Sequence, residues 1–165
     1  MRVGPPGWTG RDQLVEVKAF VAREKPGPED VVLLACDRGA GDVGELGSFE
    51  GAPIYRAACV GSVHTSVIEY LIQTWAGGLL IVSCPPRDCW NREGVSWLEE
   101  RVHHDREAEL KARVDRKRLR ITFAALAERK AIAVELEDFR REVRAMAAAT
   151  GEEEIEIDTE CETPR

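Results

Sequence analysis

Three short runs of mostly apolar residues each end in a cysteine, and they constrain the fold more than any other feature of the chain. They are VVLLAC at 31–36, IYRAAC at 54–59 and LLIVSC at 79–84. Each run has the length of a strand and is bounded or preceded by turn residues, which is typical of buried β-strands. A fourth run, LRITFAAL at 119–126, favours a strand, with a partly helical alternative.

Segments with helical periodicity separate these runs. A Thr-x-x-Asp start at Thr9 and Asp12 predicts a capped helix before the first run. Apolar residues recur at helical spacing through 63–75 and end before two glycines, which favour a helix C-terminus. Further helical stripes cover 95–116 and 131–149, whereas the Gly-rich stretch 37–53 leaves room only for a small helix.

Strands that are apolar throughout and alternate with helices indicate a parallel sheet covered on both faces. We therefore expect an α/β fold: a three-layer open sheet of about four mostly parallel strands with helices on both faces, flavodoxin- or Rossmann-like. A chain of 165 residues without repeats fits one domain of this kind. We expect an N-terminal helical extension at 1–29, an α/β domain at 30–150 and an acidic C-terminal tail at 151–165.

The negative charge of the chain belongs to that tail. The whole chain has a net charge of -7, with 30 acidic and 23 basic side chains. Seven of the acids and one arginine fall in the last fifteen residues, so residues 1–150 are almost neutral. A block of like charge indicates a solvated, flexible terminus. The alternating acidic and apolar residues at 154–158 also have the period of a strand, and pairing with a sheet edge is the alternative.

Composition also limits the partners and the compartment. The acidic balance argues against a surface shaped for nucleic acid, and the basic residues near 113–120 are interleaved with acids, as on a solvated helix. The first residues lack the apolar stretch of a secretory signal, and no run approaches the ~20 apolar residues of a membrane span. We expect a soluble, cytoplasmic protein, in which clustered cysteines more often bind metal or do redox chemistry than form disulfides.

The cysteines are the candidate functional residues. Cys36, Cys59 and Cys84 each close a predicted strand, and Cys89 follows in the loop CPPRDC. Any one of them alone would more often be a small packing residue. The carboxyl ends of parallel strands lie along one edge of an open sheet, where ligand sites form, so we expect the four thiols to converge there. Cys161, in the acidic tail, is expected to be a free thiol.

Convergent thiols leave three kinds of site open: a tetrathiolate zinc, an iron-sulfur cluster or a redox dithiol. Structural zinc sites typically use closely spaced Cys-x-x-Cys pairs, which this chain lacks. Iron-sulfur clusters also use four thiolates. His64, His103 and His104 lack ligand spacing with the cysteines, and the glycines at 39–47 do not match a dinucleotide-binding pattern. Trp90, beside Cys89, would shield a bound group or face a partner.

Several motifs resemble one family. The sequences ACDRGAGD at 35–42, CVGSV at 59–63 and WAGGLLIVSCPPRDCWNREG at 75–94, with Arg101, are similar to the delta subunit of methyl-viologen-reducing hydrogenase. This is a small iron-sulfur subunit that accompanies heterodisulfide-reductase-like flavoproteins. The resemblance covers about residues 30–147. Members of the family commonly carry a Cys-Cys-x-x-Cys arrangement in the first motif, where this chain has Ala35, Cys36 and Gly39.

The resemblance implies an electron-transfer subunit with a 2Fe-2S cluster in an α/β iron-sulfur domain at 30–150. Its ligands would be Cys36, Cys59, Cys84 and Cys89. The chain would do no bond chemistry of its own. It would pass electrons between a heterodisulfide-reductase-A-like flavoprotein and a hydrogenase, a formate dehydrogenase or another catalytic oxidoreductase. The alternatives from other classes are a structural zinc-binding interaction module and a thiol redox protein.

Overall fold

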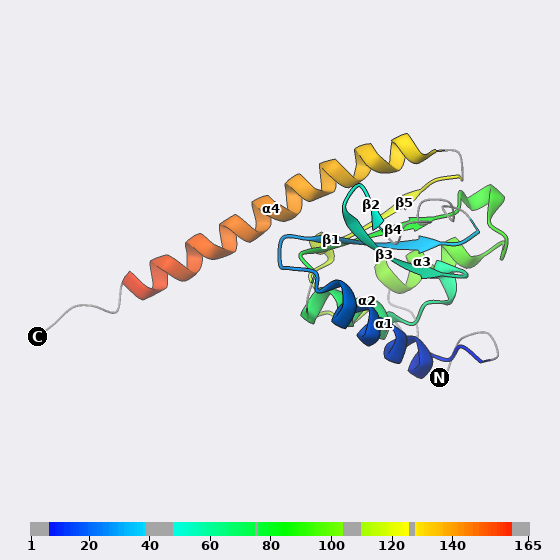
Figure 1. Cartoon of the computed structure of the whole chain (residues 1–165), viewed down its shortest axis with the longest axis horizontal. Coiled ribbons are helices and arrows are strands. Elements are labelled where there is room, and N and C mark those ends of the chain that lie inside the picture. Colours follow the sequence, from blue (N-terminus) through cyan, green and yellow to red (C-terminus); the bar gives the residue numbers. More distant parts are fainter. Residues whose placement is uncertain (1–6, 39–47, 75, 104–109, 126–127, 160–165) are drawn as a thin grey trace, which may run out of the picture.

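The computed structural model describes residues 7–38, 48–74, 76–103, 110–125 and 128–159, without side chains for Thr74 and 150–159. The chain forms an α/β fold with helices packed on a single β-sheet (Figure 1). Its helices are α1 (Gly10–Glu24), α2 (Thr65–Thr74), α3 (Gly94–His103) and α4 (Arg129–Thr159), joined by the short 3-10 turns η2 (Val60–Ser62), η3 (Pro86–Asp88) and η4 (Arg116–Arg118). Its strands are β1 (Val31–Cys36), β2 (Ser48–Phe49), β3 (Ala52–Ala57), β4 (Gly78–Ser83) and β5 (Leu119–Phe123).

The sheet has the strand order β2-β3-β1-β4-β5. Strands β3, β1, β4 and β5 are parallel, and β2 pairs antiparallel with β3. The predicted open, mostly parallel sheet is therefore confirmed, with one short strand more than expected. β2 has only two residues, too few for a periodic pattern to reveal it. Strand β3 begins and ends two residues earlier than the run 54–59 suggests, and β5 ends at Phe123 rather than at residue 126.

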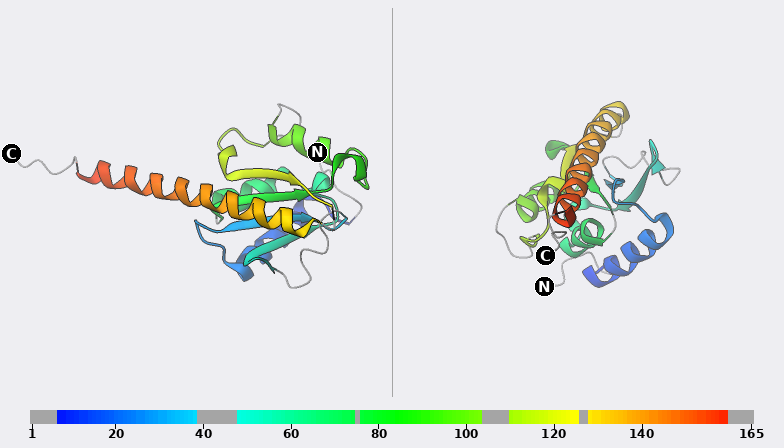
Figure 2. Two further views of the ribbon diagram at one scale, coloured as in Figure 1. Left: turned by 90° about the horizontal axis from the view of Figure 1, so that it is seen from above. Right: turned by 90° about the vertical axis from the view of Figure 1, so that its left-hand side faces the viewer.

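Helices cover both faces of the sheet, which makes the three predicted layers (Figure 2). Helices α1, α2 and α3 lie on one face and α4 lies on the other. All six residues of β1 and all six of β4 are buried, because alternate side chains enter the two separate cores. This explains why the central runs are apolar throughout instead of alternating with polar residues.

Helix α1 is part of this body. Its N-terminus carries the predicted capping box between Thr9 and Asp12. Val17, Phe20 and Val21 on its inner face are buried in the core shared with α2. Burial of these side chains fixes the helix on the sheet, although the segment lies before the first strand.

The prediction of one helix over 95–116 is wrong in its second half. Helix α3 ends at His103, residues 104–109 lie outside the described structure, and 110–115 form a turn rather than a helix. The apolar residues Leu110 and Val114 are nevertheless buried. The N–H of Leu110 donates to the carbonyl of Arg101, so an irregular segment returns along α3 and fills the same core. Burial without helical structure produced the apolar spacing that indicated a helix.

Helix α4 runs past residue 150, where the acidic tail begins, to Thr159. Residues 154–158 are helical, so their alternation of acidic and apolar residues does not form a strand. The end of α4 extends beyond the sheet, on the side away from the carboxyl ends of the parallel strands (Figures 1 and 2). Cys161 lies outside the described residues. Within the described part of the chain, no helix combines the length and apolarity needed to cross a membrane.

Candidate metal centre

Two of the four candidate cysteines meet at the centre of the sheet. Cys36 is the last residue of β1, and Cys84 follows the last residue of the neighbouring strand β4. Their sulfurs are 3.4 Å apart and both side chains are buried. The chain leaves β1 toward β3 on one side and leaves β4 toward β5 on the other. The pair therefore lies at the switch point of an open parallel sheet, where such folds bind their ligands.

Cys59 joins this pair from the next strand. It lies two residues after β3 and precedes the 3-10 turn η2. Its thiol hydrogen-bonds the sulfur of Cys36 and lowers the pKa of Cys36, because the bond stabilises the thiolate there. The same hydrogen bond, with burial, raises the pKa of Cys59. The two directions agree that negative charge is better stabilised on Cys36 than on Cys59.

Cys89 completes the group from the loop after β4. It follows the turn η3 and is the only one of the four that is partly exposed. A Cβ atom placed on Gly94 would lie 3.0 Å from the sulfur of Cys59 and 3.5 Å from that of Cys89. Both sulfurs thus lie against the start of α3. The four thiols therefore lie near one another at one edge of the sheet, as predicted. Their role as metal ligands stays a prediction.

The sulfur geometry can be compared with that of metal sites. Two thiolates on one tetrahedral metal, with metal–sulfur bonds of about 2.3 Å, lie about 3.8 Å apart. The 3.4 Å between Cys36 and Cys84 is close to this value. In the described part of the chain, no three His, Cys, Asp or Glu side chains are grouped to hold one ion. Among the described residues, it is the spacing of Cys36 and Cys84 that matches a ligand pair.

Backbone N–H groups point at the sulfurs. Those of Arg38 and Val60 donate to Cys36, and that of Gly61 donates to Cys59. Of these three donors, Gly61 belongs to the motif CVGSV at 59–63. Such donors stabilise negative charge on sulfur.

Gly61 and Gly94 let two backbones touch beside Cys59. A Cβ on Gly61 would lie 2.2 Å from the carbonyl oxygen of Gly94 and 2.5 Å from its Cα. These are backbone atoms, which cannot turn away as a side chain does. The sequence showed both glycines, but their contact joins segments more than thirty residues apart and has no local signal.

We expect Gly61→Ala to lower the free energy of unfolding by about 1–3 kcal/mol, the usual cost of forcing extra atoms into a packed site. It should also disturb the position of Cys59. Urea unfolding of the metal-free protein measures the first effect. Gly27→Ala is the control, because a Cβ there meets only the side chain of Asp30, at 3.3 Å. Equal stability of the two variants would contradict a required contact at Gly61.

Arg101 links the segment after Cys59 to α3 by hydrogen bonds. Its guanidinium donates to the carbonyls of Gly61 and Val63 and to that of Trp97 within α3. The side chain is buried, and burial lowers its pKa while the nearby Cys59 opposes that shift. A buried cation thus lies beside the sulfurs. The sequence marks Arg101 as part of the family motif, but only the fold reveals its contacts.

Gln13 attaches α1 to the cysteine loop. It is fully buried; its amide nitrogen donates to the carbonyls of Trp8 and Ser62, at 3.3 and 3.1 Å. Its amide oxygen accepts from the N–H of His64, at 2.7 Å. Sequence reasoning missed this residue, whose only signal is a polar side chain on the inner face of an amphipathic helix.

We expect Gln13→Ala to destabilise the protein by about 1–3 kcal/mol, because it removes the partner of the partly buried N–H of His64 and of the partly buried carbonyls of Trp8 and Ser62. Denaturant unfolding followed by circular dichroism measures the change. The matched control is Val15→Ala, since Val15 on the same helix is exposed and should change stability by less than about 0.5 kcal/mol. Similar values for both variants would refute the role of Gln13.

The histidines do not join the cysteines. The Nδ1 of His64 pairs with the hydroxyl of Ser66 at 2.9 Å, and burial and Arg101 lower the pKa of His64. His103 is exposed at the end of α3, and His104 lies outside the described residues. His103 is thus a surface residue, whereas His64 is partly buried just before α2.

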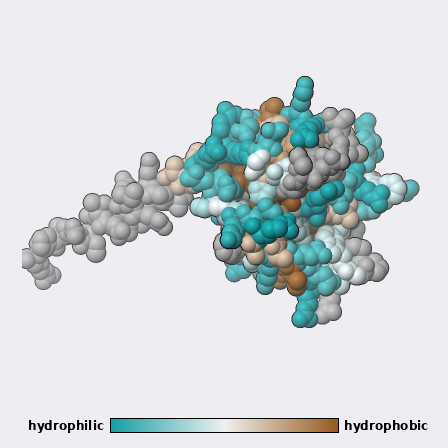
Figure 3. All heavy atoms as spheres, in the orientation of Figure 1, coloured by the Kyte–Doolittle hydropathy of each residue, from teal (hydrophilic) through white to brown (hydrophobic). Residues whose placement is uncertain are grey.

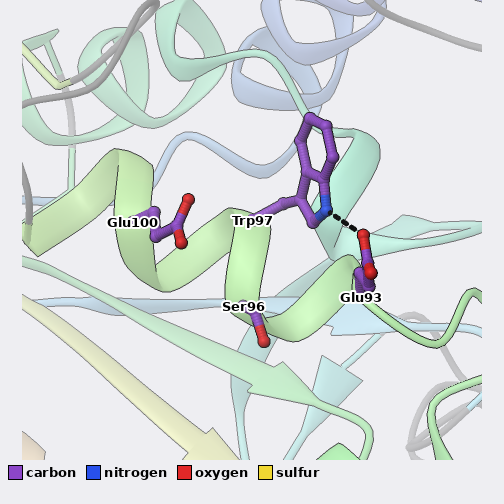
Figure 4. A pocket seen from close by; sticks show the side chains of 4 residues that line it. All are labelled: Glu93, Ser96, Trp97 and Glu100. Carbon is purple, nitrogen blue, oxygen red and sulfur yellow. Dashed lines mark hydrogen bonds between the residues drawn. The ribbon is translucent and has the colours of Figure 1, made fainter.

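A separate surface pocket lies on the outer side of α3, lined by Glu93, Ser96, Trp97 and Glu100 (Figure 4). The indole N–H of Trp97 donates to the carboxylate of Glu93 at 3.0 Å across it. None of the four cysteines lines this pocket. The thiol group therefore remains the candidate site.

The comparison with protein families gives one match. The family model described as methyl-viologen-reducing hydrogenase, delta subunit, matches residues 31–147. This range holds β1 to β5, all four clustered cysteines and Arg101, and it leaves out α1. No curated protein matches the chain.

Proposed function

Because this chain belongs to the methyl-viologen-reducing hydrogenase delta subunit family, we propose that it is the electron-transfer subunit of an oxidoreductase complex. We further propose that Cys36, Cys59, Cys84 and Cys89 hold a 2Fe-2S cluster. The family name is that of a hydrogenase subunit, which supports a role beside a catalytic redox partner.

The observation that carries the proposal is the meeting of four thiols from four separate segments at the switch point of the sheet. Cys36 contacts Cys84 and Cys59, while Cys59 and Cys89 border Gly94. A 2Fe-2S cluster takes four thiolates, two on each iron. The spacing of Cys36 and Cys84 suits two thiolates on one metal.

The residues around the four thiols would stabilise the negative charge of the thiolates. When bound, the cluster supplies a centre that gains and loses one electron. Burial of three of the sulfurs excludes water from them. The backbone donors and the buried guanidinium of Arg101 compensate the thiolates' negative charge, and Pro85 and Pro86 stiffen the loop before Cys89.

The proposed partners are a heterodisulfide-reductase-A-like flavoprotein on one side and a catalytic oxidoreductase, such as a hydrogenase or formate dehydrogenase, on the other. The chain would pass single electrons between them. This part of the proposal is supported by family membership alone.

A thiol redox protein fits the geometry less well. Such proteins need a cysteine that is both acidic and accessible. The cysteine with a lowered pKa, Cys36, is only 1% exposed. A zinc module is the other alternative, because four thiolates also suit zinc.

An anaerobic reductive titration tests the proposed function. The purified protein is titrated with a low-potential reductant while its visible absorption is recorded. We expect a charge-transfer band that bleaches with one electron per chain and returns on oxidation. A band that does not respond, or a colourless protein that contains zinc, would contradict an electron-transfer role.

A further inference from the structure

Among the described residues, the thiol group reaches solvent at Cys89. Cys36, Cys59 and Cys84 are buried, whereas Cys89 is partly exposed at the end of η3. The residues around Cys89, from Pro86 to Glu93, are exposed except for Cys89 itself. An electron that enters or leaves the site by the shortest route therefore crosses this loop.

An aromatic side chain stands at that opening. Trp90 follows Cys89 and is 70% exposed. The guanidinium carbon of Arg38 lies 4.6 Å from the centre of its ring. Arg38 comes two residues after Cys36, so the stack joins the segments that follow β1 and β4. Exposed Trp and Arg side chains held in place by each other are typical of the residues that dominate protein interfaces.

The charge around Trp90 is positive on balance. Arg38, Arg87 and Arg92 have no ion pair with any other described residue. The loop also carries Asp88 and Glu93, and the carboxylate of Glu93 faces α3, where it accepts from Trp97. Arg38 stacks on the exposed indole, and Arg87 and Arg92 lie within three residues of Trp90 in the sequence, although the chain as a whole has a charge of -7. Elsewhere, on the face that Figure 3 shows, apolar side chains are scattered among hydrophilic ones.

We propose that Trp90 with Arg38, Arg87 and Arg92 forms the electron-transfer docking surface, and that the redox partner presents carboxylates to it. The inference rests on the proposed function. In each transfer the partner loses one electron and the chain's centre gains it, or the reverse, and no bond forms. The arginines would steer an acidic partner, and the indole would fill the contact above Cys89.

Small redox probes of opposite charge test this surface directly. The reduced, cluster-loaded full chain is mixed in a stopped-flow instrument with ferricyanide, an anion, or with hexaammineruthenium(III), a cation. We expect the rate of oxidation by ferricyanide to fall as ionic strength rises and the rate with the cation to increase. The opposite salt dependence would mean that the net negative charge governs approach, and it would overturn the inference.

Variants of the docking surface test whether its side chains cause this salt dependence. Replacing Arg38, Arg87 and Arg92 by Gln should slow oxidation by ferricyanide several-fold and remove most of its salt dependence. Trp90→Ala should slow the reaction with both probes. Val134→Ala is the control, because Val134 on α4 is 63% exposed, and it should change neither rate. Unchanged rates in the arginine and Trp90 variants would refute the docking surface.

Failure of the inference can be told apart from failure of the proposed function. Iron content and visible absorption are measured for every variant before mixing. Full absorption with rates that do not depend on these side chains refutes only the surface. A wild-type chain that takes up no iron refutes the proposed function and the inference with it.

Discussion

Replacing Cys84 with serine is expected to lose most of the bound iron and sulfide and the visible absorption of the protein. Cys84 lies at the centre of the thiol group, 3.4 Å from Cys36, so its loss removes one of a ligand pair. Changes in the surroundings of a metal ligand already weaken metal binding by about 10–100-fold, and loss of the ligand itself should cost more. Iron analysis of anaerobically reconstituted protein measures the effect.

Cys161→Ser is the matched control for this variant. Cys161 lies in the acidic tail and outside the described residues, and it is expected to be a free thiol. This variant should retain its iron and its absorption. Equal losses from the two variants, or retention of iron by Cys84→Ser, would contradict the assigned ligands.

Replacing Arg101 with glutamine is expected to have the largest effect outside the cysteines. Arg101 donates to the carbonyls of Gly61, Val63 and Trp97, and hydrogen bonds from a charged group contribute about 1.5–3 kcal/mol each without adding fully. We expect the free energy of unfolding of the metal-free protein, measured by urea denaturation, to fall by about 3 kcal/mol. The reduction potential should also fall, because a cation that stabilises the reduced centre is removed.

Arg116→Gln separates the two effects of Arg101. Arg116 also donates to backbone carbonyls, those of Val102 and Leu110, but at the other end of α3 from Gly94. It should lose stability without a shift in potential. Arg101→Lys should keep part of the charge effect while losing the forked hydrogen bonds. A potential that shifts equally in both glutamine variants would mean that Arg101 acts only on stability.

The central fold was predictable because its signals are local. β1 and β4 are buried on both faces, and this leaves continuous apolar runs in the sequence. The meeting of Cys36 and Cys84 follows from the rule that parallel strands end at a common edge. The capping box at Thr9 and Asp12 is likewise contained within one turn of chain.

The features that sequence reasoning missed depend on contacts between distant segments. Gln13 bonds residues about fifty positions away, and Arg101 reaches back forty positions to Gly61. Leu110 and Val114 have helical spacing, yet they fill the core from an irregular segment. Arg38 and Trp90 form their stack only because β1 and β4 are neighbours. In each case the residue type is visible in the sequence, but its partner is not.

The content of iron and acid-labile sulfide in the anaerobically purified full chain tests the central claim most directly. We expect two iron and two sulfide per chain, together with a reducible charge-transfer absorption that Cys161→Ser retains and Cys84→Ser loses. One zinc per chain, without iron or sulfide, would contradict the 2Fe-2S centre.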